Sequence, residues 1–317
     1  MIAFVFPGQG AQYVGMGKEI AQAFPEAREV FARASEVLGI DLARLCWEGP
    51  EHALRQTENT QPAILTTSCA CLAVLAEHGW RPAMAAGLSL GEYTALVCAG
   101  ALGLGDALRV VRRRGQFMQE AAQGRRTAMA AIVGLDAHAV GRVCAGAARH
   151  GVVEPANFNS PGQVAIAGDE AAVFEAIVRA KAAGARRAVL LPVSAPFHTS
   201  LMRSAAERLA PILEALALTE AAIPVVSNVS AQPVRAPEEI RRLLLAQVAS
   251  PVRWDDSVTA MAARGVTTFV EIGPGTSLSG LIRRTASGVR TAHVEDRASL
   301  VDAMRVLEED RVADGQV

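Results

Sequence analysis

The chain has 317 residues, of which 51% are hydrophobic and 20% are charged. This length and composition predict a globular protein with one large domain, or with a large domain that carries an insertion. The 31 basic and 32 acidic residues leave a net charge of -1, so no overall field favours nucleic acid or a membrane surface, and neither is expected as a partner.

The cysteines and the apolar runs indicate where the protein works. Five cysteines without paired C-x-x-C spacing predict a reduced, cytoplasmic protein with no metal site. The apolar run at residues 2–6 is shorter than a signal-peptide core and lacks a basic flank. No later run approaches the roughly 18 residues of a membrane span, so we expect a protein that stays inside the cell and off the membrane.

Residues 2–6 predict a buried parallel strand that leads into the glycine-rich loop 7–12. The loop lacks the Gly-Lys-Ser/Thr of a phosphate-binding loop, and helix follows it where a nucleotide-binding unit needs a second strand. The chain also contains a G-x-S-x-G pattern at residues 87–91. In hydrolases with this pattern, one of the two N–H groups that stabilise the oxyanion comes from such a loop. The backbone N–H of Gln9 is therefore a candidate donor, and a plain strand-to-helix connection is the alternative.

From residue 18 to about residue 80 the apolar residues fall at helical spacing. Residues 63–76 are apolar nearly all round, which predicts a buried helix. We expect Gln61 and Pro62 to start it, because proline suits a first turn. Gln61 then reaches into a site at the helix start, or serves as a structural amide.

The stretch 87–92 is a G-x-S-x-G pattern between a short apolar strand at 83–86 and a helix-compatible segment. A tight turn there exposes Ser89 at its tip. The backbone N–H of Leu90 would point at an oxyanion formed on an acylated Ser89, and the helix dipole would add to the effect. The alternative is a structural turn with a capping serine.

A helix is expected at 107–122 with Asp106 as its N-cap. Arg114 interrupts its apolar stripe, whereas Arg109 and Arg113 lie on a more polar side. Arg114 therefore either binds an anion or extends its charged end to solvent.

Residues 127–193 predict strand, helix, strand, strand, helix, strand, which is a ferredoxin-like unit. The unit reads as an insertion into the larger domain. Further strands are expected at 223–226 and, as the last one, at 268–272.

Two of the six histidines, His198 and His293, lie in strand-edge contexts where a catalytic base would be held. His198 is favoured because two prolines and Phe197 fix the backbone beside it. A structural histidine is the alternative.

Seven segments in register resemble the malonyl-CoA:acyl carrier protein transacylase family over nearly the whole chain. They are FPGQGAQ at 6–12, TQPA at 60–63, GLSLGEY at 87–93, RGQFMQEA at 114–121, NFNSPGQVAIAG at 157–168, APFHTSLM at 195–202 and EIGPG at 271–275. The resemblance implies an α/β protein: an α/β-hydrolase-like large domain with a parallel sheet (1–126 and 194–317) and an inserted ferredoxin-like small domain (127–193).

The resemblance also implies the chemistry, which is a ping-pong transfer of a malonyl group from malonyl-CoA to the phosphopantetheine thiol of an acyl carrier protein. Malonyl-CoA is then a substrate, and no cofactor is expected. By resemblance, Ser89 is the nucleophile, His198 is its base and Arg114 holds the malonyl carboxylate. The N–H groups of Gln9 and Leu90 form the oxyanion hole.

The remaining expectations from the resemblance concern supporting positions. The main-chain carbonyl of Gln247 orients the histidine, since a base needs only an acceptor at its other nitrogen. Gln61 is similar to a site glutamine, and the bulk of Phe197 suits malonyl over 2-alkylmalonyl units. Two pairs resemble a basic rim that meets the carrier protein: Arg186 with Arg187, and Arg283 with Arg284. The family more often has histidine where this chain has Leu88.

Three rival functions are weighed against this one. A hydrolase that cleaves acyl thioesters from a carrier protein lacks the clamp arginine by resemblance, whereas Arg114 is present here. A general esterase would use His293 as its base, although the expected insertion ends just before His198. A non-catalytic docking protein would have lost Ser89, His198 or Arg114, and all three remain.

Overall fold

The computed structural model describes residues 1–193 and 195–313, and its larger unit is built on a six-stranded sheet. Five strands are parallel, and the last pairs antiparallel with its neighbour. In spatial order they are β11 (Arg290–Val294), β10 (Thr268–Ile272), β1 (Ile2–Phe6), β2 (Met84–Gly87), β7 (Val225–Val226) and β8 (Pro233–Val234).

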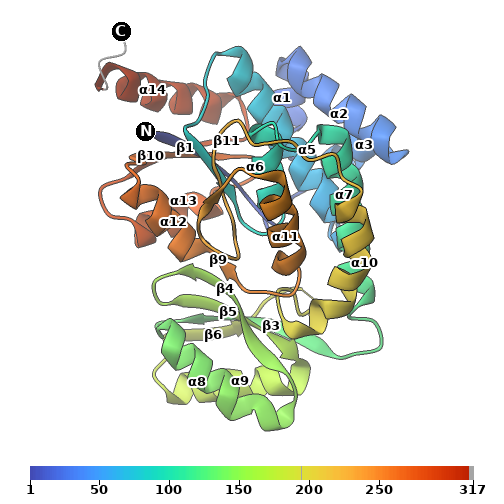
Figure 1. Cartoon of the computed structure of the whole chain (residues 1–317), viewed down its shortest axis with the longest axis vertical. Coiled ribbons are helices and arrows are strands. Elements are labelled where there is room, and N and C mark those ends of the chain that lie inside the picture. Colours follow the sequence, from blue (N-terminus) through green and yellow to red (C-terminus); the bar gives the residue numbers. More distant parts are fainter. Residues whose placement is uncertain (194, 314–317) are drawn as a thin grey trace.

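Helices surround this sheet (Figure 1). They are α1 (Lys18–Ala23), α2 (Pro25–Leu38), α3 (Leu42–Glu48), α4 (Glu51–Leu54), α5 (Thr57–Glu77), α6 (Gly91–Cys98), α7 (Leu104–Glu120), α10 (Arg203–Glu214), α11 (Pro237–Gln247), α12 (Trp254–Ala263), α13 (Ser277–Thr285) and α14 (Arg297–Ala313). Short 3₁₀ helices span Ala148–His150 and Ser200–Met202. Within residues 1–193 and 195–313, no helix has the length and apolar character to cross a membrane.

Strand β1 shows why the sheet is covered on both faces. Successive side chains of a strand point to opposite sides. Phe4 and Phe6 join the core that includes α5, α6 and α7, whereas Ala3 and Val5 join the core formed with α12 and α13. A continuous apolar run is what a parallel strand buried on both faces requires.

The smaller unit is a second sheet that has the predicted β-α-β-β-α-β order. Its strands in spatial order are β6 (Arg187–Leu190), β3 (Thr127–Val133), β5 (Gln163–Asp169), β4 (Val153–Ser160) and β9 (Val252–Arg253). The helices α8 (Ala137–Ala147) and α9 (Glu170–Ala182) connect them. The first four strands are antiparallel to their neighbours, which is the ferredoxin-like arrangement.

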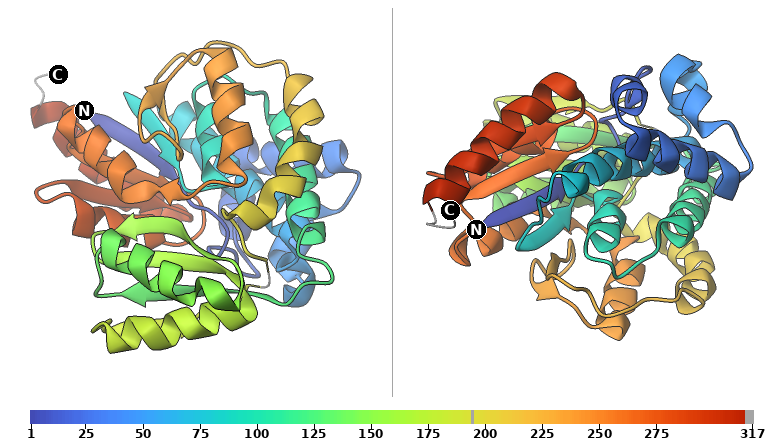
Figure 2. Two further views of the ribbon diagram at one scale, coloured as in Figure 1. Left: turned by 60° about the horizontal axis from the view of Figure 1, so that its bottom comes forward. Right: turned by 90° about the horizontal axis from the view of Figure 1, so that it is seen from above.

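The two faces of the small sheet differ in what they contact. One face packs on α8 and α9, with Ile132 and Ile166 in its core. Met129 and Ala165 point the other way and join the core of the large unit. Figure 2 shows α8 and α9 on the side turned away from the large unit. The opposite face of the sheet therefore helps to enclose the space between the two units.

The domain ranges 1–126 with 194–317 and 127–193 remain predictions. Strand β9, at residues 252–253, lies outside the expected small-domain range and still adds to its sheet, parallel to β4. Residue 194, at the expected boundary, lies outside the described residues, as do residues 314–317.

Three expectations about elements were wrong. Helix α5 begins at Thr57, which places Pro62 inside it, because its first turn is held from outside: Thr60 Oγ1 donates to the Leu54 carbonyl at 2.6 Å. Helix α7 begins at Leu104 after an extended Gly103, so Asp106 lies in the first turn, where an acidic side chain also suits the helix dipole. The strand at 268–272 is not the last, because β11 follows it at the sheet edge with a mixed polar and apolar sequence.

Candidate active site

Ser89 lies at the tip of a sharp turn between β2 and α6. Its backbone has φ 54°, a left-handed conformation that is strained for a residue with a side chain. The neighbouring glycines are needed for space, because a Cβ on Gly87 would lie 2.0 Å from the Gly91 backbone, and one on Gly91 would lie 2.1 Å from the Phe6 carbonyl oxygen. The turn therefore has the geometry of a nucleophile elbow.

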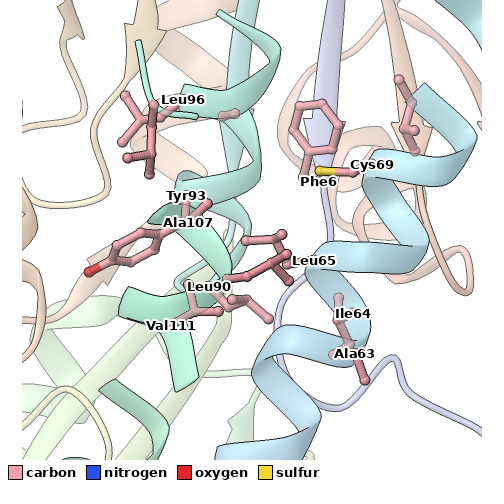
Figure 3. Packing of buried hydrophobic residues seen from close by; sticks show 14 of the residues in the cluster. Phe6, Ala63, Ile64, Leu65, Cys69, Leu90, Tyr93, Leu96, Ala107 and Val111 are labelled. Carbon is pink, nitrogen blue, oxygen red and sulfur yellow. The ribbon is translucent and has the colours of Figure 1, made fainter. Parts of the chain in front are cut away.

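The base of the turn is anchored in the hydrophobic core. Leu90, directly after the serine, is buried. Figure 3 shows its side chain gathered with Leu65 of α5 and Val111 of α7 in one apolar layer. This packing holds the turn against α5 and α7.

His198 is in place to act as the base for Ser89. Its Nε2 lies 2.7 Å from Ser89 Oγ, and its Nδ1 lies 2.9 Å from the main-chain oxygen of Gln247. A carbonyl oxygen can only accept, so Nδ1 carries the proton and the Nε2 lone pair faces the serine hydroxyl. His198 also has a left-handed backbone, with φ 61°, and such strain gathers at functional sites.

The protonation state of His198 suits that role. Burial of the imidazole, followed by the nearby Arg114 cation, lowers the pKa of His198 to about 3. The histidine is therefore neutral at neutral pH and able to take a proton.

Arg114 extends from α7 into the site and is only 1% exposed. Its guanidinium donates to Gln61 Oε1 at 2.9 Å, to Ser89 Oγ at 3.1 Å and to Gln247 Oε1 at 2.9 Å. All three acceptors are neutral oxygens, and burial lowers the pKa of the guanidinium. A buried cation with only neutral partners favours an anionic ligand.

The loop after β1 approaches the turn closely. A Cβ on Gly8 would lie 2.4 Å from the Leu88 carbonyl oxygen, so only glycine fits there. The Leu88 N–H in turn donates to the Phe6 carbonyl at 3.0 Å. This contact places Gln9 and Leu90 together on the wall of the cavity that Ser89 faces, as the expected oxyanion hole requires.

The cavity has a volume of about 670 Å³ and lies between the two units. Its lining includes Gln61, Phe197 and the Arg283 and Arg284 pair of α13. On the small-unit side it is lined by Met129, Asn157, Asn159, Gln163 and Ala165. A cavity of this size takes a substrate larger than a single acyl group.

The expected basic positions are not all at the cavity. Arg283 donates to Thr291 Oγ1 at 2.6 Å and Arg284 to Gln163 Oε1 at 2.7 Å, so Arg284 links the large unit to the small one at the rim. Arg186 and Arg187 are exposed beside the start of β6. Among the described residues that line the cavity, neither of them occurs.

The alternative base, His293, lies on the edge strand β11, in register with Glu271 of β10. The structure brings His198 to Ser89 instead. No group of three or more His, Cys, Asp or Glu side chains in residues 1–193 and 195–313 is arranged to hold a metal ion.

Sequence reasoning missed two residues beneath the turn, Glu92 and Asn228. Asn228 Oδ1 accepts the Ser89 N–H at 2.6 Å, and its Nδ2 donates to the Gly87 carbonyl at 2.7 Å. Glu92 Oε2 accepts the Asn228 N–H at 3.1 Å. A polar residue just after β7 was the available signal for Asn228, because the carboxyl ends of parallel strands meet at one edge of a sheet.

Comparison with known proteins agrees with this geometry. Residues 3–307 match the family model described as acyl transferase domain. The chain is 46% identical to malonyl CoA-acyl carrier protein transacylase of Bacillus subtilis, over 98% of each chain. It is also 46% identical to the protein of that name from Escherichia coli K12, over 96% of this chain and 99% of that one.

Solved structures of malonyl transferases are similar to this chain over nearly its whole length. An acyl carrier protein S-malonyltransferase from Vibrio cholerae superposes with a TM-score of 0.93 at 46% identity, covering 95% of this chain and 99% of that one. A malonyl-transacylase solved in complex with its type II polyketide acyl-carrier protein gives a TM-score of 0.94 at 46% identity, covering 96% and 99%. This chain belongs to the malonyl-CoA:acyl carrier protein transacylase family of acyl transferases.

Proposed function

We propose that this protein is a malonyl-CoA:acyl carrier protein S-malonyltransferase that works through a malonyl ester of Ser89. The observation that carries the proposal is the contact between Arg114 and Ser89, in which a buried guanidinium nitrogen lies 3.1 Å from the nucleophilic oxygen. A cation at that distance selects an acyl group with its own negative charge. The malonyl group has such a charge, because its carboxylate is separated from the thioester carbonyl by one methylene carbon.

In the first half-reaction, Ser89 Oγ attacks the thioester carbonyl of malonyl-CoA while its proton passes to His198 Nε2. The negative charge that develops on the carbonyl oxygen is stabilised by the N–H groups of Gln9 and Leu90. The carbon–sulfur bond then breaks, and the proton on His198 goes to the CoA thiolate. The main-chain oxygen of Gln247 stabilises the transient imidazolium through Nδ1–H.

The second half-reaction repeats these steps with another thiol. His198 takes the proton of the phosphopantetheine thiol, the sulfur attacks the malonyl-Ser89 ester, and the proton returns to Ser89 Oγ as the ester bond breaks. Arg114 holds the malonyl carboxylate throughout, which fixes the carbonyl against the incoming nucleophile. No step calls for a cofactor.

Two supporting roles and a location belong to the same proposal. The exposed Arg283 and Arg284 at the cavity rim, with Arg186 and Arg187 further out, present positive charge to an acidic carrier protein. Phe197 lines the cavity beside His198, and its bulk is assigned to the preference for malonyl over 2-alkylmalonyl units. A cytoplasmic location is supported by five cysteines that are all free, since such thiols persist in a reducing compartment.

The test is to incubate the protein with labelled malonyl-CoA, with and without a phosphopantetheinylated acyl carrier protein, and to quantify malonyl-carrier protein and free malonate. We expect rapid label transfer to the carrier protein and slow release of malonate without it. Rapid malonate release with an unlabelled carrier protein would instead identify an acyl hydrolase, the alternative kept from the sequence.

A further inference from the structure

Glu92 is a buried carboxylate next to the reaction centre that the transfer mechanism does not use. It is the second residue of α6 and is 3% exposed. Its Oε2 accepts the Gln247 side-chain Nε2 at 2.7 Å and the Asn228 main-chain N–H at 3.1 Å. Among the described residues that line the cavity, Glu92 is not found. The hydrogen-bond partners of Glu92 therefore connect it to the reaction centre.

The first partner, the amide of Gln247, has an orientation that its surroundings determine. Its Nε2 faces three acceptors: Glu92 Oε2 at 2.7 Å, the Ser89 carbonyl at 3.0 Å and Asn228 Oδ1 at 3.4 Å. Its Oε1 accepts from Arg114 at 2.9 Å. A flipped amide would set an N–H group against the guanidinium and an oxygen against the carboxylate. The bond to Glu92 is the shortest of the three, which makes it the strongest constraint on the amide.

The indirect arrangement leaves Arg114 available to a substrate. A carboxylate in direct contact with the guanidinium would take up its two parallel N–H groups and compete with the acyl carboxylate. The intervening Gln247 amide instead occupies a single guanidinium nitrogen, NH2. Burial raises the pKa of Glu92 to about 7, which is in keeping with a carboxylate that lacks a direct cationic partner.

We propose that Glu92 is a positioning residue for malonyl transfer, which holds the Arg114 guanidinium through the Gln247 amide in the orientation that receives the acyl carboxylate. The proposal rests on the function proposed above, in which Arg114 binds that carboxylate. Glu92 has a second effect through Asn228, whose side chain holds the Ser89 N–H at 2.6 Å. That second path serves every acyl donor equally, whereas the path through Gln247 and Arg114 serves only donors with a carboxylate.

This difference allows a test that does not depend on how much of a variant is folded. The ratio of kcat/KM for malonyl-CoA to kcat/KM for acetyl-CoA is measured on one preparation, so the folded fraction cancels. Glu92→Gln keeps an oxygen acceptor at the same reach and removes the charge. Glu92→Asp keeps the charge and shortens the reach by one methylene. Glu271→Asp is the matched control, because Glu271 is also a buried glutamate, whose carboxylate instead accepts from Leu278 and Ser279 at the start of α13.

We expect Glu92→Asp to lower the malonyl to acetyl ratio by about tenfold or more, as the loss of an oriented hydrogen bond in a charged network implies. Glu92→Gln should keep the ratio within about threefold of wild type, because its amide oxygen can still accept from Gln247. Glu271→Asp should lower the melting temperature and leave the ratio unchanged.

An unchanged ratio in Glu92→Asp, with or without a general loss of rate, would overturn the proposal and leave Glu92 a structural residue. An equal fall of the ratio in Glu92→Gln and Glu92→Asp would also overturn the proposal. Glu92→Gln can still accept the hydrogen bond from Gln247, so such a result would show that this bond does not position Arg114. Arg114→Ala is measured in parallel to separate the carboxylate-binding role of Arg114 from the positioning role of Glu92. If its ratio is also unchanged, the carboxylate clamp itself is wrong; if its ratio collapses while that of Glu92→Asp does not, only the positioning role fails.

Discussion

Replacing Arg114 by alanine removes the one cation that we expect to bind the malonyl carboxylate, and so tests whether malonyl-CoA is the substrate. The guanidinium is buried and has only neutral acceptors within the protein. In the proposed function, bound malonyl would supply the carboxylate that completes a buried, two-point ion pair. Truncating one partner of such a pair costs about 2 to 5 kcal/mol, which corresponds to a loss of about 30-fold to 5,000-fold in kcat/KM for malonyl-CoA.

The same substitution should lower kcat/KM for acetyl-CoA much less, because the acetyl group has no carboxylate that pairs with Arg114. The assay is kcat/KM for both donors in wild type, Arg114→Ala and Arg114→Lys. Lysine should recover little, since a point charge cannot make two parallel hydrogen bonds. Arg113→Ala is the control, because Arg113 is an exposed neighbour on the same helix that bonds to Gln116. An unchanged malonyl to acetyl ratio in Arg114→Ala would refute the clamp.

Three further predictions concern the base and the turn. His198→Ala should slow acylation of Ser89 by about 10² to 10⁴, the usual worth of a general base, as measured by rapid quench; a loss below about threefold would contradict that role. Leu88→His should leave transfer within about tenfold, because neither proton transfer nor oxyanion stabilisation passes through that side chain, and a collapse of kcat would show that position 88 sets the turn. In Arg114→Ala the pKa of His198, followed by NMR titration of its ring protons, should rise from its low value because a nearby cation is gone; an unchanged or lower midpoint would contradict the electrostatic coupling.

The parts of the site that were predicted from the sequence depend on residues that lie close together along the chain. The glycines beside Ser89 and the apolar strand before it define the turn within a few residues. The ferredoxin-like order of residues 127–193 was likewise predicted from the apolar periodicity within each short segment. Both signals depend on neighbours along the chain, so a sequence without coordinates contains them.

The interactions beneath the turn could not be predicted in this way. Glu92 forms hydrogen bonds with Asn228 and Gln247, which lie 136 and 155 residues further along the chain. No local pattern in any of the three segments indicates that they come into contact. The role of the Gln247 side chain was also missed, because the resemblance concerned its main-chain oxygen. Helix α5 starts earlier than its apolar pattern suggests, since the N–H of its first residue, Thr57, donates to the Gln119 side chain from α7.

In the proposed mechanism the acyl group passes through Ser89. The most direct measurement is intact-protein mass spectrometry of the wild type and of Ser89→Ala after exposure to malonyl-CoA, followed by addition of holo acyl carrier protein. The wild type should gain the mass of one malonyl group, peptide mapping should place it on Ser89, and the carrier protein should remove it. Ser89→Ala should gain no mass and transfer nothing. A malonyl adduct on Ser89→Ala, or a wild-type adduct that the carrier protein cannot discharge, would show that transfer does not pass through Ser89.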